Sequence, residues 1–378
     1  MHFSQQQQRA LDKVAAWLHS DQQVFTLFGY AGTGKTTLAK HLGADFYAAY
    51  TGKAAFVLRG KGCPGASTIH SLIYHPKEKS QLRLYSLIAE QQEDPTPERA
   101  QAIEVERANL RRVSFTLNID SPLRGARLLV IDECSMVNEE IGRDLESFGC
   151  KILVLGDPAQ LPPVMGGGYY TNREPDVLLT EVHRQAADSP IVSLATHIRT
   201  RGALPTHHPL LRSRGTLTPD DALAMDQLIV GRNRTRHTTN QRMRTLLGFT
   251  GDFPQPGERV VCLKNNHMLG ILNGALYTVV SSCGDRDWVE MTIADELTGI
   301  NIDAMVNPEP FRGEEVPYEN QRDYDTFDYG YALTCHKCQG SQWNKVGVIN
   351  ESGAFRQDAA RWLYTAVTRA AEELWVAS

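Results

Sequence analysis

The chain has 378 residues, of which 42% are hydrophobic and 22% charged, and its formal net charge is −5. This length allows a large core spread over two or more domains, and the composition is that of an ordinary globular protein without an apolar run long enough to span a membrane. The net negative charge excludes a protein that coats nucleic acid through overall basicity, so any such affinity must come from local groups and depend on salt.

A glycine-rich loop follows the first predicted strand, Val24 to Phe28. Its spacing is Gly29-x-x-x-x-Gly34-Lys35-Thr36, and it leads into a predicted helix from Thr37 to Leu42. In this P-loop pattern, backbone N–H groups bind phosphate oxygens at the positive end of the helix. Lys35 is expected to reach the terminal phosphates of ATP, and the Thr36 hydroxyl to bind Mg²⁺. The predicted ATP-binding residues of the loop are Gly29, Gly32, Thr33, Gly34, Lys35, Thr36 and Thr37.

The flanking segments alternate between helix and strand. Ala10 to Leu18 has helical periodicity, and Asp45 to Ala49 is a predicted second strand. Residues from about 77 to 112 are rich in Glu, Gln and Arg and contain helix-like stretches such as Glu98 to Leu110. They predict a helical insertion, extending over about 77–125, which either projects from the motor to act on a substrate or is a solvated decoration.

Two further apolar strands are predicted at Arg127 to Ile131 and Lys151 to Leu155, and polar side chains follow both of them. Asp132 is expected to hold Mg²⁺ through water, and Glu133 to orient the attacking water as a general base. Gln160 lies in a proline-stiffened loop after the second strand, where it could sense the γ-phosphate. Strands that alternate with helices predict a parallel sheet with its site at the carboxyl ends of the strands.

A second α/β pattern begins near Gln227 to Gly231 and closes with a strand at Leu374 to Val376. Between about 254 and 324, short β-like runs at 259–263, 276–281 and 288–293 are separated by turn signals, which predicts a small β-barrel inserted in the second domain. Arg361 to Ala370 is a predicted helix with Arg369 near its end. A surface cation is the alternative interpretation of Arg369.

Taken in order, these residues resemble the motifs of a superfamily 1 DNA helicase of the RecD/Dda type, the branch that moves 5′ to 3′. Ser4-x-x-Gln7-x-x-Ala10 resembles the Q motif, and the segments 51–55 and 68–70 resemble motifs that touch DNA. The segments 179–185, 334–342 and 364–370 resemble the later helicase motifs. Cys338 and Gln342 depart from the pattern, where serine or threonine and glutamate are usual. The change at Gln342 weakens a carboxylate contact to ribose at that position.

The resemblance implies two RecA-like parallel-sheet domains in tandem, 1–180 and 181–378, with ATP and Mg²⁺ in the cleft between them and an SH3-like barrel in the second. It implies that Gln7 reads the adenine and that Arg184 and Arg369 are arginine fingers. The implied DNA contacts are hydroxyls and cations, as a sequence-independent backbone track requires. They are Thr51, Lys53, Thr68, His70, Thr334, His336, Lys337 and Ser341.

The predicted function is therefore ATP-dependent translocation on single-stranded DNA and duplex unwinding. The predicted setting is a monomer in the cytoplasm of a bacterial or phage-infected cell, with no membrane association, acting at single/double-strand junctions with replication or recombination proteins as partners. The seven scattered cysteines suit this reducing compartment and argue against zinc at Cys335 and Cys338.

Three alternatives stay open. They are an ATPase that acts on RNA, a P-loop kinase of a small molecule, and a nucleic-acid-binding module with a vestigial ATP site. The kinase leaves Gln160, Arg184 and the 334–342 segment without a role. The intact Lys35 and Glu133 argue against a vestigial site.

Overall fold

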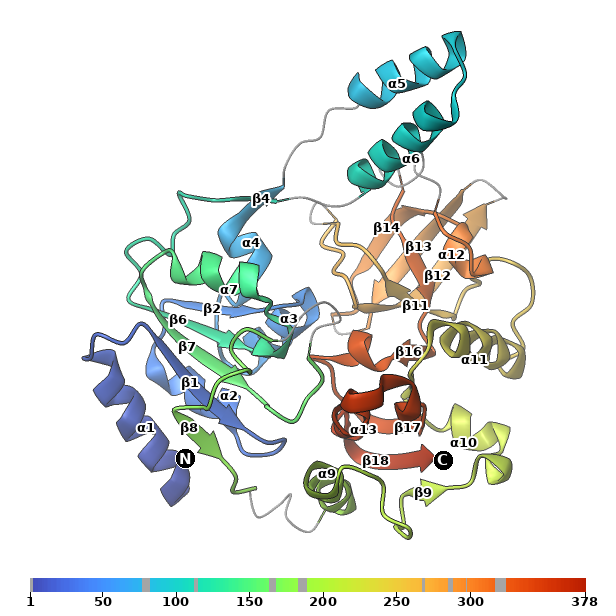
Figure 1. Ribbon diagram of the computed structural model, residues 1–378. Helices are drawn as coiled ribbons and strands as arrows, with labels where there is room; N and C mark the ends of the chain where they lie inside the picture. Colours follow the sequence, from blue (N-terminus) through green and yellow to red (C-terminus); the bar gives the residue numbers. More distant parts are fainter. Residues whose placement is uncertain are drawn as a thin grey trace.

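The computed structural model describes residues 3–76, 82–111, 115–162, 168–182, 189–266, 269–284, 288–296, 298–316 and 324–378. Within these ranges the chain forms two α/β lobes, each around a parallel sheet, and an antiparallel sheet beside the second lobe (Figure 1). A helical hairpin projects from the first lobe. None of the helices in the described ranges has the length and apolar character of a membrane span.

The first parallel sheet has the strand order β3-β2-β6-β7-β1-β8. Its strands are β1 (Val24–Gly29), β2 (Phe46–Ala49), β3 (Ser67–Thr68), β6 (Leu128–Asp132), β7 (Lys151–Gly156) and β8 (Val177–Leu179). The four strands predicted in this lobe are confirmed. The central strands β1, β6 and β7 are buried along almost their whole length and are mostly apolar, as expected when both faces of a parallel sheet are covered. The register pairs Leu27 with Leu155 and Ile131 with Val154, so these strands end at the same edge of the sheet.

The helices of this lobe are α1 (Gln5–Leu18), α2 (Lys35–Ala39), α3 (Gly52–Gly60), α4 (Ile69–Ile73) and α7 (Glu139–Glu146), with 3₁₀ turns at Lys40–Leu42 and Cys134–Met136. Helix α1 begins five residues before its predicted start because Ser4 and Gln7 form a capping box at its N-terminus. Its buried face packs Val14 and Trp17 into the same core cluster as Phe25 of β1.

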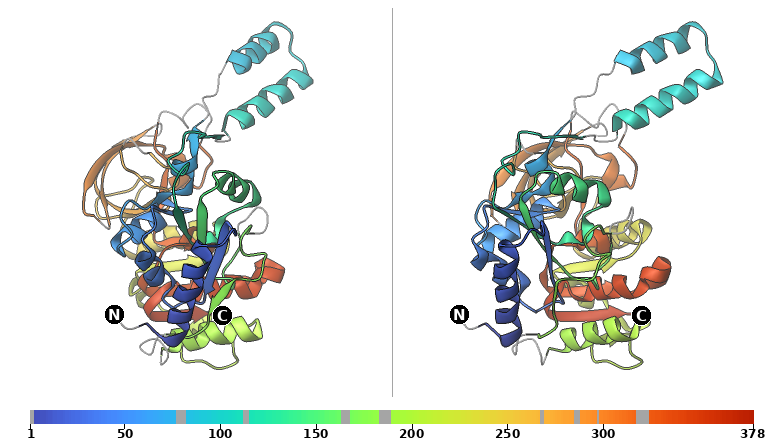
Figure 2. Two further views of the ribbon diagram at one scale, coloured as in Figure 1. Left: turned by 90° about the vertical axis from the view of Figure 1, so that its left-hand side faces the viewer. Right: turned by 60° about the vertical axis from the view of Figure 1, so that its left-hand side comes forward.

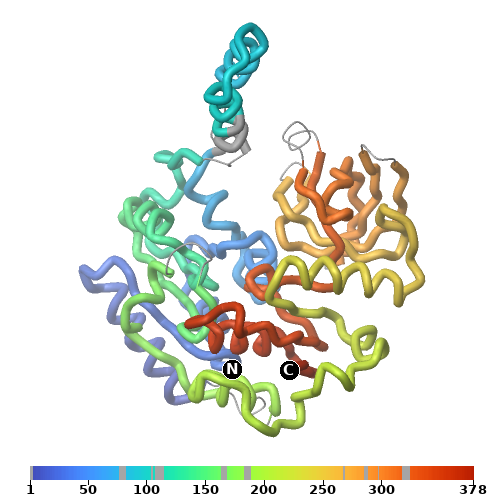
Figure 3. Tube along the Cα trace, turned by 45° about the vertical axis from the view of Figure 1, so that its right-hand side comes forward, coloured from blue at the N-terminus to red at the C-terminus, as the bar shows by residue number. Residues whose placement is uncertain are grey.

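The insertion is a helical hairpin on a two-stranded stalk. The stalk strands β4 (Tyr74–Pro76) and β5 (Phe115–Leu117) pair antiparallel, and α5 (Leu82–Glu93) and α6 (Pro97–Arg111) pack on each other through Leu84 and Ile103. Figures 1, 2 and 3 show this hairpin extending away from both lobes. Leu82 and Tyr85 are 77% and 60% exposed. The predicted helix at 98–110 is confirmed.

The second parallel sheet has the order β16-β10-β17-β18-β9. Its strands are β9 (Leu211–Arg212), β10 (Gln227–Val230), β16 (Ala332–Thr334), β17 (Trp343–Ile349) and β18 (Ala370–Ala377), and its helices are α9 (Pro190–Arg201), α10 (Pro219–Leu223), α11 (Asn233–Leu246) and α13 (Ala359–Val367). Short 3₁₀ segments occupy Arg214–Thr216, Cys335–Cys338 and Ser352–Asp358. The helix predicted to reach Ala370 is wrong at its end. Pairing of Ala370 with Trp343 starts strand β18, which leaves Arg369 in the turn after α13.

The antiparallel sheet has the order β14-β13-β12-β11-β15. Its strands are β11 (Arg259–Cys262), β12 (Leu276–Gly284), β13 (Val289–Asp295), β14 (Asn301–Val306) and β15 (Phe327–Tyr329). The short helix α12 (Glu309–Arg312) lies between β14 and β15 in the chain and contacts β15. The three predicted runs are confirmed as β11, β12 and β13. Strand β15 lies beyond the predicted limit at 324, because three residues are too short to produce a recognisable alternation.

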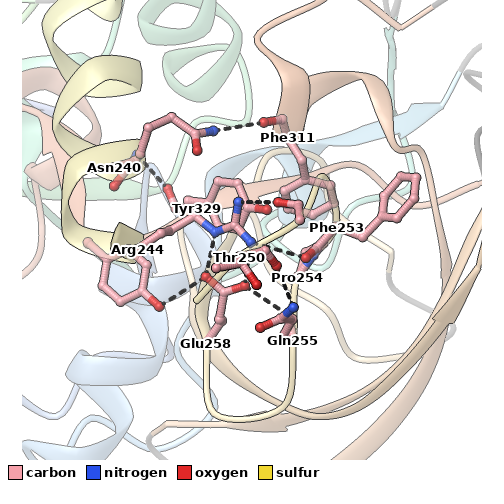
Figure 4. Close-up of polar contacts among 12 residues, drawn as sticks. Asn240, Arg244, Thr250, Phe253, Pro254, Gln255, Glu258, Phe311 and Tyr329 are labelled. Carbon is pink, nitrogen blue, oxygen red and sulfur yellow. Dashed lines mark hydrogen bonds and ion pairs between the residues drawn. The ribbon is translucent and has the colours of Figure 1, made fainter. Parts of the chain in front are cut away.

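A buried ion pair fixes α11 to the antiparallel sheet (Figure 4). The Arg244 guanidinium donates to Glu258 at 2.7 and 2.9 Å and to the carbonyl of Phe253 at 3.1 Å, and it stacks over the Tyr329 ring at 4.2 Å. Asn240 donates to the Tyr329 carbonyl at 2.9 Å. Because both charges are buried and their polar atoms are used, this part of the second lobe is held as one unit.

Candidate ATP site and nucleic-acid track

The P-loop backbone has the shape of a phosphate cradle. Gly32 and Gly34 have φ angles of 79° and 81°, in the left-handed region that favours glycine. A Cβ on Gly29 would lie 2.5 Å from Thr33 Oγ1 and 2.9 Å from Leu179 Cβ, so no other residue fits there. The Lys35 ammonium folds back over the loop and donates to the Gly29 carbonyl at 2.5 Å. The residues therefore fit the triphosphate of a nucleotide.

A hydroxyl and a carboxylate meet beside the loop, as predicted for Mg²⁺. Thr36 Oγ1 donates to Asp132 Oδ2 at 2.9 Å. These hard oxygen donors suit Mg²⁺, which keeps several waters and takes further ligands from phosphates. Within the described ranges, no cluster of three or more His, Cys, Asp or Glu side chains forms another metal site.

Glu133 has a strained backbone. Its φ of 55° is left-handed, one of two such values among the described non-glycine residues. Burial raises the pKa of Glu133, Asp132 raises it further, and the positive charges of Arg369 and Lys35 oppose the shift. A raised pKa makes a carboxylate a stronger base once it is ionised, which fits the role predicted for Glu133.

The loop after β7 connects the two lobes. The Leu161 backbone N–H donates to Thr365 Oγ1 at 2.8 Å, and its carbonyl accepts from Gln339 Nε2 at 2.9 Å. The adjacent Gln160 side chain is buried, and its Oε1 accepts no hydrogen bond within the described part of the chain. A buried amide oxygen without a partner is a natural contact for a ligand or its water.

One cavity of about 630 Å³ collects the predicted catalytic groups from both lobes. The first lobe supplies the predicted catalytic residues Lys35, Asp132, Glu133 and Gln160, and the second supplies Arg369. Thr36, a predicted Mg²⁺ ligand, and Ser341, a predicted DNA contact, line the same cavity. Arg369 is only 6% exposed, and its guanidinium donates to the carbonyls of Thr365 and Ser341, each at 3.1 Å. The surface-cation interpretation of Arg369 is therefore wrong. The other predicted arginine finger, Arg184, lies outside the described residues.

A larger cavity, about 820 Å³, lies between α11, α12 and the antiparallel sheet. Its lining includes Arg234, His237 and Lys264 but no residue of the P-loop. The motifs, rather than cavity size, locate the predicted chemistry.

Gln7 supports the P-loop from α1. Its Nε2 donates to the Thr33 carbonyl at 3.1 Å, and its Oε1 accepts from the Ser4 N–H at 3.0 Å. The side chain is buried. Its predicted contact with adenine stays a prediction.

The predicted DNA contacts of the first lobe have local roles as well. Thr51 and Thr68 are the N-caps of α3 and α4, whose backbone N–H groups donate to their hydroxyls. His70 is half-buried among aromatic rings, with the Phe115 centroid at 5.2 Å, and burial lowers its pKa. Lys53 is buried with its ammonium 4.6 Å from the Trp343 ring centroid, and burial lowers the pKa of Lys53 to about 8.

The corresponding residues of the second lobe follow β16. Thr334 and Ser341 are buried, and His336 is half-buried, which lowers its pKa. Burial, with repulsion from Arg236, lowers the pKa of Lys337 to about 8. A Cβ on Gly340 would lie 3.6 Å from Thr51 Oγ1, so the segments 51–54 and 340–343 face each other across the cleft. Thr68 and His70 lie at the N-terminal end of α4, the helix that follows α3 in the first lobe.

The sequence interpretation missed two aromatic contacts at the P-loop. The Arg199 guanidinium of α9 stacks on the Tyr30 ring at 3.7 Å, and the Tyr364 hydroxyl of α13 accepts from the Ala31 N–H at 3.1 Å. Tyr364 stands inside a recognised motif, but its position on the buried face of a helix resembles that of an ordinary core residue.

Comparison with known proteins supplies the family. The family described as "AAA domain" matches residues 2–218, more than half of the chain. The chain belongs to this family. A second match, "UvrD-like helicase C-terminal domain", covers residues 329–377. The two matches follow each other along the chain, and the second lies within the second lobe.

The curated relatives are longer than this chain. It is 27% identical to the "ATP-dependent RecD2 DNA helicase" of Deinococcus radiodurans, over 99% of this chain and 49% of that protein. It is 22% identical to the "Probable conjugal transfer protein TraA" of Sinorhizobium fredii, over 99% of this chain and 32% of that protein. The chain thus spans about half of the first relative and a third of the second.

Solved structures share the fold. A Bacteroides Pif1 bound to ssDNA superposes with a TM-score of 0.58 at 18% identity, covering 100% of this chain and 92% of that one. Pif1 helicase from Candida albicans gives 0.55 at 19%, covering 100% and 94%. These similarities confirm the α/β, RecA-like P-loop core.

Proposed function

We propose that this protein is a helicase, an ATP-dependent motor that translocates 5′ to 3′ on single-stranded DNA and unwinds duplex DNA. The observation that supports this most is the cavity whose walls carry Lys35, Glu133 and Gln160 from one lobe and Arg369 from the other. A nucleotide there would contact both lobes, so its binding would favour the closed arrangement and its hydrolysis would release it. Alternating closure becomes movement when both lobes hold the same strand.

Each of these residues has a distinct role in the proposed cycle of ATP binding and hydrolysis. Lys35 and the P-loop amides hold the phosphates of ATP, while Thr36 and Asp132 hold Mg²⁺, which neutralises charge on the phosphates. Glu133 orients the attacking water and accepts its proton. Gln160 senses the γ-phosphate, and Arg369 with Arg184 stabilises the charge that develops during transfer.

The proposed strand path uses the eight hydroxyl and cationic side chains of the two lobes. The relative from Deinococcus is named a DNA helicase, and a Pif1 structure contains ssDNA, which supports DNA rather than RNA. The antiparallel sheet would be the SH3-like barrel of the second domain, and the protein would act as a cytoplasmic monomer at single/double-strand junctions, with replication or recombination proteins as partners.

The α5–α6 hairpin is the proposed strand-separating element. Residues 82–111 contain four arginines against six carboxylates, so overall charge would not draw this hairpin to phosphate. Its projection from the stalk and its exposed Leu82 and Tyr85 instead suit a steric wedge that meets unpaired bases.

ATP turnover and unwinding test the proposal. Turnover is measured without nucleic acid, with ssDNA and with ssRNA, and unwinding on 5′-tailed, 3′-tailed and blunt duplexes. We expect stimulation by ssDNA and unwinding of the 5′-tailed duplex alone, with both lost in Lys35→Ala. If only ssRNA stimulates ATP turnover, the protein is a motor that acts on RNA. If neither ssDNA nor ssRNA changes the rate of ATP turnover, the proposal of a nucleic-acid motor is contradicted.

A further inference from the structure

The Tyr364 hydroxyl bridges two catalytic segments of the opposite lobe. Tyr364 lies on α13 and is 2% exposed. Its hydroxyl oxygen accepts a hydrogen bond from the Ala31 N–H of the P-loop at 3.1 Å, and its O–H donates one to Asp157 Oδ2 at 2.8 Å. Both partners belong to the first lobe, so the two hydrogen bonds can exist only while the lobes are in contact.

Asp157 shapes the loop that carries Gln160. Its Oδ1 accepts from the Ala159 N–H at 3.0 Å, and its carbonyl accepts from the Gln160 N–H at 3.2 Å. The carboxylate that accepts the Tyr364 hydrogen bond therefore also holds the turn that places the Gln160 amide in the cavity. Burial beside Asp157 raises the pKa of Tyr364, so the hydroxyl keeps its proton at neutral pH.

The next residue extends the connection to Arg369. Thr365 Oγ1 accepts from the Leu161 N–H at 2.8 Å, and the Thr365 carbonyl accepts from Arg369 Nε at 3.1 Å. Two consecutive side chains of α13 thus bind the P-loop and the 157–161 loop, while the same turn of helix anchors the guanidinium. A displacement of the P-loop or the 157–161 loop would therefore shift Arg369 through this chain of hydrogen bonds.

We propose that Tyr364 is a positioning residue that makes assembly of the hydrolytic site depend on closure of the lobes. The inference rests on the proposed function and adds a residue to it. With the lobes closed, one hydroxyl sets the P-loop amide, the Gln160 turn and the helix of Arg369 together. When they separate, both hydrogen bonds are lost at once, and hydrolysis stops before the chain loses its grip on the nucleotide.

Tyr364→Phe tests this, because the ring stays and only the hydroxyl is removed. Tyr331→Phe is the matched control. The Tyr331 hydroxyl also accepts a backbone N–H, from Arg259 at 3.3 Å, and donates to a buried carboxylate, Glu258 at 3.4 Å, but within the second lobe. Both variants are assayed for ssDNA-stimulated kcat, KM for ATP, ssDNA binding without nucleotide, and melting temperature.

We expect kcat of Tyr364→Phe to fall about tenfold or more, the equivalent of one hydrogen bond to a charged group, with KM within about threefold. Tyr331→Phe should lower the melting temperature similarly and keep kcat within about twofold of the parent. A Tyr364→Phe kcat within about threefold of the parent would overturn the proposal. Equal losses of kcat in both variants would also overturn it, as would loss of cooperative melting by Tyr364→Phe. In either case the Tyr364 hydroxyl would stabilise the folded protein and would not specifically position the hydrolytic site.

The parent separates this inference from the function on which it rests. Absence of ssDNA-stimulated turnover in the parent contradicts the motor itself. Stimulated turnover in the parent that Tyr364→Phe retains contradicts only the role of Tyr364.

Discussion

Replacement of Arg369 tests whether the second lobe takes part in hydrolysis. In the functional interpretation its guanidinium stabilises charge at the γ-phosphate, a contribution of about 10³-fold or more in turnover. ATP affinity should change little in Arg369→Ala, because Lys35 and the P-loop amides remain. DNA binding without nucleotide should be unchanged.

The structure adds a stability cost that must be separated from catalysis. Arg369 is buried and donates hydrogen bonds to the carbonyls of Thr365 and Ser341 and to Thr368 Oγ1. Truncation leaves these acceptors without their donor, which costs about 1–3 kcal/mol. Arg369→Lys keeps the charge but loses the planar fork, so it should recover stability more than turnover.

The charge of Arg369 also has a pH signature. It lowers the pKa of Glu133 against the larger effect of burial, so its removal should raise that pKa further. Since the base must be ionised, the residual turnover of Arg369→Ala should be lost at a higher pH than that of the parent as the pH falls. Arg369→Lys should stay close to the parent profile.

The assay combines ssDNA-stimulated turnover from pH 5 to 9, equilibrium ATP binding and thermal melting of both variants. An Arg369→Ala turnover within about threefold of the parent would refute the arginine finger, given the much larger loss expected. A loss of ATP binding as large as the loss of turnover would instead make Arg369 a ground-state ligand.

Three further predictions concern other parts of the chain. Glu133→Gln should bind ATP normally while turnover falls on the order of a hundredfold, and equal loss of binding would make Glu133 structural. Replacing residues 77–112 by a short linker should spare ssDNA-stimulated ATP turnover and reduce unwinding, whereas loss of both in a folded protein would place the hairpin in the motor core. For Lys337, a pKa near 8 in the folded state means that the unfolded chain binds more protons between about pH 8 and 10.5, so stability of the parent rises with pH there. Lys337→Met should reduce this rise, to which Lys53 contributes as well. It should also increase the free energy of unfolding at pH 7 by on the order of 1–3 kcal/mol and weaken ssDNA binding. A flat parent profile would contradict the buried charge.

Local patterns predicted the first lobe well. The P-loop needs its strand, its glycines and its helix within consecutive residues, so spacing alone located Lys35 and Thr36. Asp132 and Glu133 follow a buried strand whose apolar run is equally local. The parallel sheet then brings these distant segments to one edge, so the ends of its apolar strands gather the residues of the predicted site.

Features set by pairing across the chain were harder to predict. The end of α13 is decided by the pairing of Ala370 with Trp343, twenty-seven positions earlier, and not by helix propensity. Strand β15 forms one edge of the antiparallel sheet with three buried residues, which are too few to show an alternation. Tyr364 matters because of Ala31 and Asp157, which no local window contains.

This division between local and long-range features has a functional consequence. The groups proposed to hold the nucleotide come from the first lobe, as do Glu133 and Gln160, while Arg369 and Tyr364 belong to the second. Variants of the P-loop should therefore change ATP binding and turnover together, whereas variants of α13 should change turnover with binding nearly intact. A motor needs this separation, because nucleotide must stay bound while the lobes open and close, and hydrolysis must wait for the closed state.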